Sequence, residues 1–147
     1  MSLFFLTRTV SLNKRISVPV DDVLRTLHDS QAIIELNPLV VDVAPDAADP
    51  NLYHVTDILS VLGLRIPTKY TTKFQLVEDG FDSRTEAGLK TSLNDCWRAR
   101  AVEGGTEVTE VVTIKAFFLV MPFVAGNLEQ SHQDLLNQLA AKLESSD

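Results

Sequence analysis

The sequence predicts an α+β fold in which an antiparallel sheet of about six or seven strands supplies the surface on which one long C-terminal helix lies. Residues 121–145 repeat apolar side chains at intervals of three and four, which indicates an amphipathic helix with one buried side. Residues 52–117 alternate apolar and polar side chains between tight-turn signals, which is typical of an antiparallel meander. The helix needs a broad apolar surface, and such a sheet supplies it.

Length and composition set limits on the class of protein. The 147 residues, 45% of them hydrophobic, predict one domain over residues 1–147 with a proper core. A net charge of −7 and a pI near 4.9 disfavour nucleic acid or an anionic membrane as partner. The single cysteine, Cys96, excludes an intrachain disulfide. We expect no integral membrane association and a cytoplasmic protein, since Leu3 to Leu6 is too short for a signal sequence.

The N-terminal third predicts a strand, two short helices and a second strand. Leu3 to Ser11 is rich in β-branched and aromatic residues and forms the first strand. Pro19 opens a helix, because proline suits the first helical turn. A second short helix begins at Ser30 and stops before Asn37-Pro38, after which Leu39 to Val43 resumes as a strand.

Two glycine-containing turns set the register of the later strands. Asp79-Gly80 predicts a hairpin that pairs Glu78 with Phe81, and Gly104-Gly105 predicts one that pairs Glu103 with Thr106. Each register agrees with the hydrophobic alternation of its strands. The two together turn one set of side chains towards the helix: Tyr70, Thr72, Phe74, Phe81, Ser83, Thr85, Asp95, Trp97, Glu110, Val112 and Ile114.

The order of strand, two short helices, further strands and one long helix resembles the START-like or SRPBCC superfamily. Its helix-grip fold is that of the birch-pollen allergen type and of bacterial polyketide aromatase/cyclases. Three segments, residues 36–40, 53–54 and 131–135, are similar to an uncharacterised fungal branch of that superfamily. The resemblance implies a helix-grip fold, in which a curved antiparallel sheet wraps the long helix and leaves an elongated apolar cavity between them. It also implies a lipid, sterol, hormone or polyketide as ligand. Some members cyclise, dehydrate or aromatise what they bind.

Four titratable residues are the catalytic candidates. His132 lies in the apolar stripe of the long helix, and Asp57, Asp95 and Glu110 lie on the inward face of the strands. A buried carboxylate needs a donor, water or a ligand, and a ligand cavity provides one. Two alternatives stay open. His132 could be a core histidine satisfied by a hydroxyl, and Asp95 and Glu110 could lie near open sheet ends, capped by loop amides.

The ligand-binding candidates are inward aromatic, hydroxyl and aliphatic side chains: Tyr53, Tyr70, Thr72, Phe74, Trp97, Leu128 and Leu135. The alternative is that the aromatic ones are simply core residues. His54, Arg98 and Arg100 fall on the outer face. If the phase of their strand were wrong by one residue, the two arginines would line the cavity instead and could bind a carboxylate.

Other chemistries find little support in the sequence. His28, His54 and His132 belong to separate elements without the close spacing of zinc motifs, so we expect no metal. No glycine-rich phosphate loop is present, and we expect no cofactor. Cys96 falls on the outer face beside arginines, which is weak evidence for a nucleophile.

Two function classes remain, and we expect a small hydrophobic molecule as partner in both. The first is a cofactor-free cyclase, dehydratase or isomerase acting on a polyketide or terpenoid in secondary metabolism. The second is a non-catalytic carrier of a lipid or small hydrophobic ligand. Inward carboxylates favour the enzyme, because a pure lipid carrier has little use for them. The third function is that of an interaction-only protein, which predicts no cavity. A homodimer is an open alternative for the assembly. The nuclear-transport-factor type is the alternative fold.

Overall fold

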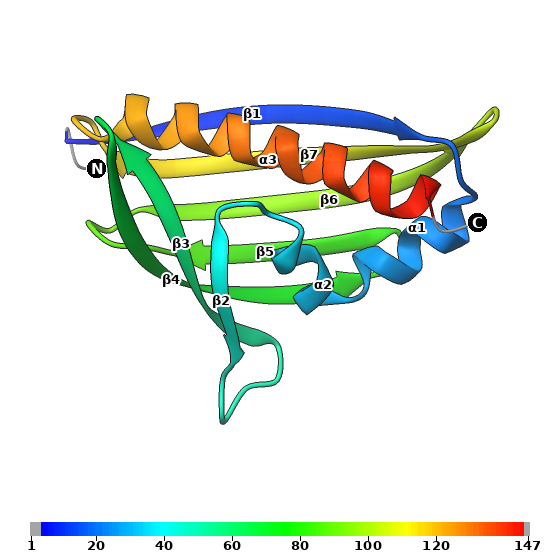
Figure 1. Ribbon diagram of the computed structural model, residues 1–147, viewed down its shortest axis with the longest axis horizontal. Coiled ribbons are helices and arrows are strands. Elements are labelled where there is room, and N and C mark those ends of the chain that lie inside the picture. The colour runs from blue at the N-terminus through cyan, green and yellow to red at the C-terminus, as the bar shows by residue number, and fades with distance from the viewer. Residues whose placement is uncertain (1–3, 146–147) are drawn as a thin grey trace.

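The structure is a computed structural model that describes residues 4–145, and its elements follow the predicted order (Figure 1). The strands and helices are β1 (Phe5–Ile16), α1 (Val20–Leu27), α2 (Ser30–Glu35), β2 (Val40–Pro45), β3 (Leu52–Val61), β4 (Leu64–Val77), β5 (Gly80–Glu86), β6 (Ser92–Val102), β7 (Gly105–Phe117) and α3 (Met121–Glu144).

The seven strands form one antiparallel sheet in the order β1-β7-β6-β5-β4-β3-β2. The sheet curves strongly, so that β2 and β3 cross the direction of β1 and β7, and α3 lies along its hollow side (Figure 1). The helices α1 and α2 close the end of the hollow near the C-terminus of α3 (Figure 1). The predicted α+β helix-grip arrangement is therefore confirmed. Within residues 4–145, no helix combines the length and hydropathy that crossing a bilayer requires.

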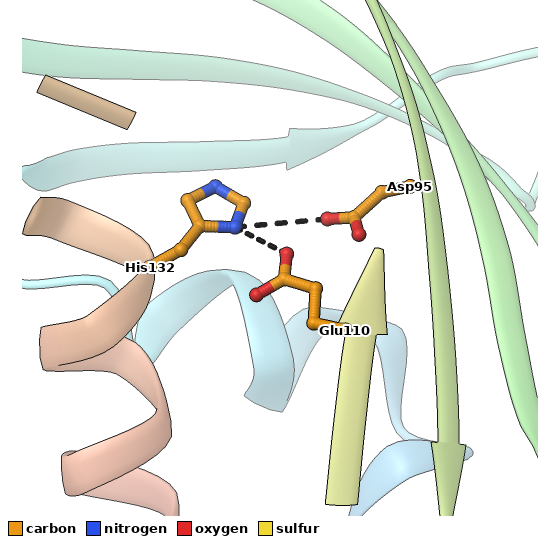
Figure 2. A group of neighbouring side chains, drawn as sticks. All are labelled: Asp95, Glu110 and His132. Atoms are coloured by element: carbon orange, nitrogen blue, oxygen red, sulfur yellow. Dashed lines mark hydrogen bonds and ion pairs between the residues drawn. The ribbon is translucent and has the colours of Figure 1, made fainter. Parts of the chain in front are cut away.

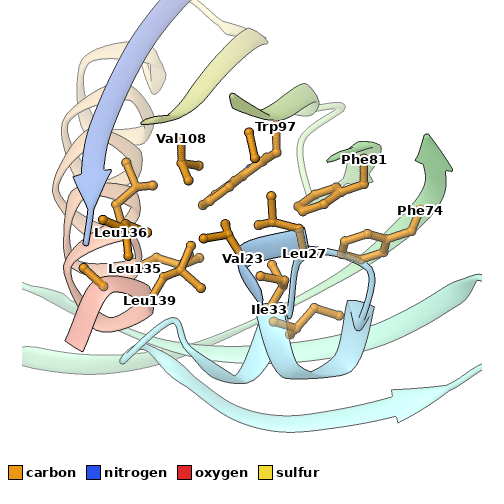
Figure 3. Close-up of a cluster of buried hydrophobic side chains, with 14 of the residues drawn as sticks. Val23, Leu27, Ile33, Phe74, Phe81, Trp97, Val108, Leu135, Leu136 and Leu139 are labelled. Carbon is orange, nitrogen blue, oxygen red and sulfur yellow. The ribbon is translucent and has the colours of Figure 1, made fainter. Parts of the chain in front are cut away.

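The apolar stripe of α3 packs into the sheet as its spacing predicts. Leu135, Leu136 and Leu139 are at most 5% exposed and face Trp97 and Val108 of the sheet (Figure 3). Side chains of α1 and α2 complete this cluster from the other side (Figure 3). A second apolar cluster joins the first turns of α3 to β7 through Met121, Ala125, Leu128, Val112, Ile114 and Ala116. The helix is thus held at both ends.

Several strands are longer than the sequence pattern indicates. The first strand was expected over Leu3 to Ser11; Leu3 lies outside the described residues, and β1 continues to Ile16 because it pairs with β7 along its whole length. The strand β4 begins at Leu64, where a two-residue turn at Leu62-Gly63 joins it to β3. Pairing with a neighbour, and not alternation alone, decides these ends.

Both predicted hairpin registers were wrong by two residues. The loops are Glu78-Asp79 and Glu103-Gly104, so Val77 pairs with Gly80 and Val102 with Gly105. Gly80 and Gly105 thus belong to strands and not to the loops. Glycine is needed at both positions, because a Cβ on Gly80 would lie 1.9 Å from the Trp97 carbonyl oxygen and one on Gly105 would lie 2.2 Å from that of Ile16. A shift of two keeps every side chain on its predicted face, since strands alternate with a period of two.

Candidate active site

A cavity of about 360 Å³ lies between the first half of α3 and the sheet. Its wall is mostly apolar and includes Leu39, Leu59, Leu93, Val124 and Leu128. Small side chains leave the space: Thr68, Thr85, Ala87, Gly88, Thr91 and Ser131 stand where larger ones would fill the core. The predicted hollow between sheet and helix is therefore present, whereas the interaction-only alternative predicted none.

A smaller cavity of about 70 Å³ adjoins it towards α2. Its floor is a row of aromatic rings from neighbouring strands, with Phe74 and Phe81 at a centroid distance of 5.0 Å and Phe81 and Trp97 stacked at 5.5 Å. Both cavities share the same polar boundary, which consists of Asn37, Tyr70, Thr85, Asp95 and His132. The polar groups of the interior thus gather at one place between two apolar spaces.

Three titratable side chains meet at that boundary (Figure 2). His132 reaches from α3 and its Nδ1 is hydrogen-bonded to Oε2 of Glu110, which comes from the middle of β7. The same nitrogen lies 3.7 Å from Oδ2 of Asp95 on β6. The other ring nitrogen, Nε2, points away from both carboxyl groups (Figure 2). Asp95 and Glu110 lie within their strands and not at open sheet ends, so the alternative of capping by loop amides is wrong.

Burial governs the protonation of this cluster. Glu110 has no exposed surface, and burial raises its pKa to about 7, although Asp95 and the Trp97 indole favour its charged form. Burial and the neighbouring Glu110 raise the pKa of Asp95 well above its usual range. Burial lowers the pKa of His132, and the nearby Asp95 and Asp57 offset part of this effect. Burial therefore favours the protonated form of Asp95 and the neutral form of the His132 imidazole.

The hydrogen bond to Glu110 decides which nitrogen of His132 is available. A charged Glu110 accepts a proton from Nδ1–H, which leaves Nε2 without a proton and able to act as a base. One oxygen of each carboxyl group, Oδ1 of Asp95 and Oε1 of Glu110, is buried without a hydrogen bond of normal geometry from any described residue. Such groups are costly in a core and are found where a ligand or proton transfer uses them.

Within residues 4–145, the same three side chains form a group that could hold a metal ion. Their ligand atoms lie within 4.8 Å of one another, and imidazole with two carboxylates suits a divalent cation by type. Nδ1 of His132 and Oε2 of Glu110 are bonded directly to each other, which is the arrangement of an imidazole oriented for proton transfer. We therefore interpret the cluster as a proton-transfer group.

A second polar pair stands on the β3–β4 side of the cavity. The hydroxyl of Tyr70 donates to Oδ1 of Asp57 at 3.0 Å. Burial raises the pKa of Asp57, with Tyr70 and His132 opposing it, and burial beside Asp57 also raises the pKa of Tyr70. The phenol thus keeps its proton. A ligand in the cavity would contact this hydroxyl–carboxyl pair on one wall and the His132 cluster on another.

The structure brings most of the predicted site residues to the cavities, with two differences. Asp57, Tyr70, Asp95, Leu128 and His132 line the larger one, and Tyr70, Thr72, Phe74, Asp95, Trp97, His132 and Leu135 line the smaller. Glu110 lines neither, because it lies fully buried behind His132. Tyr53 also lines neither and packs edge-on against Phe74 at 5.8 Å.

Sequence reasoning missed Asn37, Asn127 and Phe123 as cavity residues. Asn37 was interpreted only as a helix stop, yet it is 8% exposed and its side-chain oxygen accepts a hydrogen bond from the Leu39 amide at 3.0 Å. A polar residue between two apolar segments beside a proline was the available signal.

The outer face is as expected. His54 is exposed and bonds Oδ1 of Asp46 at 2.8 Å, and Arg100 pairs with Glu107. Arg98 donates to the carbonyl oxygens of Phe81 and Trp97 and pairs with Asp82. The arginines do not line the cavities, so the alternative phase for their strand is wrong.

Comparison with known proteins shows a family and a fold. Residues 5–145 match the family model described as Domain of unknown function (DUF7053). No curated protein matches the chain.

Among solved structures, the chain is similar to Ara h 8.0201, with a TM-score of 0.71 and 15% identity over 95% of this chain and 99% of that one. It is similar to the Zhui aromatase/cyclase from Streptomyces sp. R1128, with a TM-score of 0.70 and 16% identity over 95% and 94%. The di-domain ARO/CYC BexL from the BE-7585A biosynthetic pathway gives a TM-score of 0.72 and 16% identity, over 97% of this chain and 52% of BexL. At such identity these likenesses show the fold alone. They confirm the helix-grip fold, whereas membership of the SRPBCC superfamily and of its fungal branch stays a prediction.

Proposed function

Because the chain belongs to the family described as Domain of unknown function (DUF7053), we propose a function from its own site. The proposal is a cofactor-free enzyme that binds a polyketide or terpenoid and catalyses cyclisation, dehydration or isomerisation by acid and base chemistry. One observation carries it: the His132 imidazole stands in the wall of an apolar cavity, hydrogen-bonded to the buried Glu110 carboxyl group and 3.7 Å from that of Asp95, whose raised pKa favours its protonated form. The shared fold of aromatase/cyclases supports the substrate class.

The chemistry common to these reactions is enolisation. Nε2 of His132 removes a proton from the carbon next to a carbonyl group, and the electron pair moves to the carbonyl oxygen. Asp95 donates its proton to that oxygen, so an enol forms and no charge is left on the substrate. Glu110 stabilises the imidazolium through Nδ1–H while it exists. Glu110 is thus a positioning residue, since it does not reach the cavity.

The remaining wall orients the substrate. The Tyr70 hydroxyl and Asp57 offer a donor and an acceptor for a second oxygen of the ligand. The apolar side chains of α3 and β6 exclude water from the reacting atoms, which strengthens the interactions of the polar groups. Holding a flexible chain near its reactive geometry can contribute several kcal/mol to catalysis.

A carrier without catalysis is the second candidate, and the mostly apolar wall of the larger cavity favours it. In that case burial of apolar area supplies the affinity and the polar groups only fix the orientation of the ligand. For either role we propose a cytoplasmic location and a single domain over residues 1–147. The proposal also includes membership of the fungal branch and assembly as a monomer or homodimer.

The test separates binding from proton transfer with two probes. Anilinonaphthalene sulfonate reports an apolar cavity by its fluorescence, and 5-nitrobenzisoxazole opens to a coloured phenolate when a base removes its ring proton. We expect the protein to bind the first and to accelerate opening of the second. His132→Gln, which keeps a donor for Glu110, should retain dye binding and lose the acceleration.

His54→Gln is the matched control, because His54 also pairs with a carboxylate but lies on the outer face. It should leave both readouts unchanged. Retained acceleration in His132→Gln would contradict the role of His132, and dye binding without any acceleration in the unmodified protein would favour the carrier.

A further inference from the structure

One end of the molecule presents apolar side chains at the tips of its loops. Leu62 of the β3–β4 turn is 99% exposed, Leu89 of the β5–β6 loop 72%, and Leu119 of the β7–α3 loop 70%. All three connections lie at the end of the molecule where α3 begins (Figure 1). Leu89 and Phe123 also line the larger cavity, so this end of the molecule includes part of the cavity wall and is called its mouth below.

The stability of the fold does not account for the presence of leucine at positions 62 and 89. Leu62 and Leu89 have φ values of 51° and 57°, in the left-handed region that glycine and asparagine adopt most readily. A leucine there is strained, and its exposure means that burial within the chain does not offset the strain. Strained, exposed apolar residues at two separate loops of one mouth indicate a surface that another apolar phase covers.

The charge around this mouth is opposite to that of the whole chain. Arg65 follows Leu64, Lys90 follows Leu89, and both are exposed. Among the described residues neither has an ion-pair partner within 4.0 Å. The segments 58–68, 87–91 and 115–123 contain no Asp or Glu, although the net charge is −7. The overall acidity disfavours an anionic surface as partner, but this end is locally apolar and basic.

We propose that this end docks on the surface of a lipid bilayer that contains anionic headgroups. The leucines enter the boundary between headgroups and acyl chains, and Arg65 and Lys90 contact the phosphates. The mouth then faces the membrane, so an apolar ligand passes between bilayer and cavity without crossing water. This last step rests on the proposed function, whereas docking itself does not.

Vesicle flotation tests the docking. The protein is mixed with vesicles of phosphatidylcholine alone or of phosphatidylcholine with a minor fraction of phosphatidylglycerol. We expect binding to the anionic vesicles that weakens with salt, and a loss of about tenfold or more in Leu62→Asn with Leu89→Asn, because two leucines no longer enter the bilayer. Unfolding in urea should show this double variant to be as stable as the unmodified protein or more so, since asparagine tolerates positive φ.

Leu76→Asn is the matched control, a 48% exposed leucine at the opposite end of β4. It should float like the unmodified protein. Absence of binding to anionic vesicles, or an equal loss in the control, would overturn the proposal. A dimer in size-exclusion chromatography that dissociates in the double variant, without vesicle binding, would also overturn it and identify a second copy as the occupant. If the unmodified protein docks on anionic vesicles but does not accelerate the opening of 5-nitrobenzisoxazole, the proposed function is contradicted and the docking proposal is not.

Discussion

Replacing Glu110 with glutamine should change how the stability of the protein depends on pH. Burial raises the pKa of Glu110 from 4.5 to about 7 in the folded chain. A carboxyl group with a raised pKa favours folding while it is protonated, so its contribution is fully present below pH 4.5 and is lost as the pH rises through about 7. At about 1.4 kcal/mol per pKa unit, this difference corresponds to about 3 kcal/mol.

Glutamine has nearly the same shape and cannot ionise. Between pH 4.5 and pH 7 the free energy of unfolding of Glu110→Gln should therefore rise by up to about 3 kcal/mol relative to the unmodified protein. The lowered pKa of His132 acts in the opposite direction, since it makes stability fall below pH 6.5, but His132 remains in both chains. Urea unfolding at several pH values, followed by the fluorescence of the single tryptophan Trp97, measures the difference.

Glu129→Gln is the control, because Glu129 is exposed on the same helix as His132. Its stability should differ from that of the unmodified protein by only a small amount at each pH tested, because the side chain is exposed. A difference for Glu110→Gln that is independent of pH would refute the argument that Glu110 is buried with a raised pKa.

Two further predictions concern the cavity and the sheet. Ser131→Leu should weaken binding of anilinonaphthalene sulfonate by tenfold or so, because the new side chain fills part of the cavity, whereas Ala141→Leu on the exposed side of α3 should not change it. Gly80→Ala should lower the free energy of unfolding by about 2 kcal/mol or more, because its Cβ would collide with the Trp97 carbonyl, whereas Gly88→Ala has nothing within 4 Å and should be near neutral in urea unfolding.

The parts of the fold that follow from local pattern could be predicted from the sequence. The stripe of α3 places Leu135, Leu139 and His132 on its buried side, because their three- and four-residue spacing leaves no other choice. The strand faces were right even where the registers were wrong. Gly80 and Gly105 were assigned to turns because glycine commonly allows a positive φ, but here it allows the close approach of another backbone. That contact is tertiary, and no local pattern reports it.

The site was predictable as a set of residue types and not as an arrangement. Asp95, Glu110 and His132 were expected inside, but which carboxyl group bonds the imidazole depends on register and on the rotation of α3. The two-residue correction of the register places Glu110 opposite Trp97, where it is fully buried, and Asp95 opposite Val112, at the cavity wall. The division into a positioning residue and an acid follows from this register together with the rotation of α3.

The proton on His132 offers the most direct test of the whole account. Ring ¹⁵N spectra at neutral pH, assigned with His132→Gln, should show a neutral imidazole with its proton on Nδ1 and a free Nε2. Addition of anilinonaphthalene sulfonate should shift the signals of His132 and leave those of His54 unchanged, because only His132 lines the cavity. A proton on Nε2, or His132 signals that do not respond to the dye while it is bound, would contradict an acid and base site in a ligand cavity.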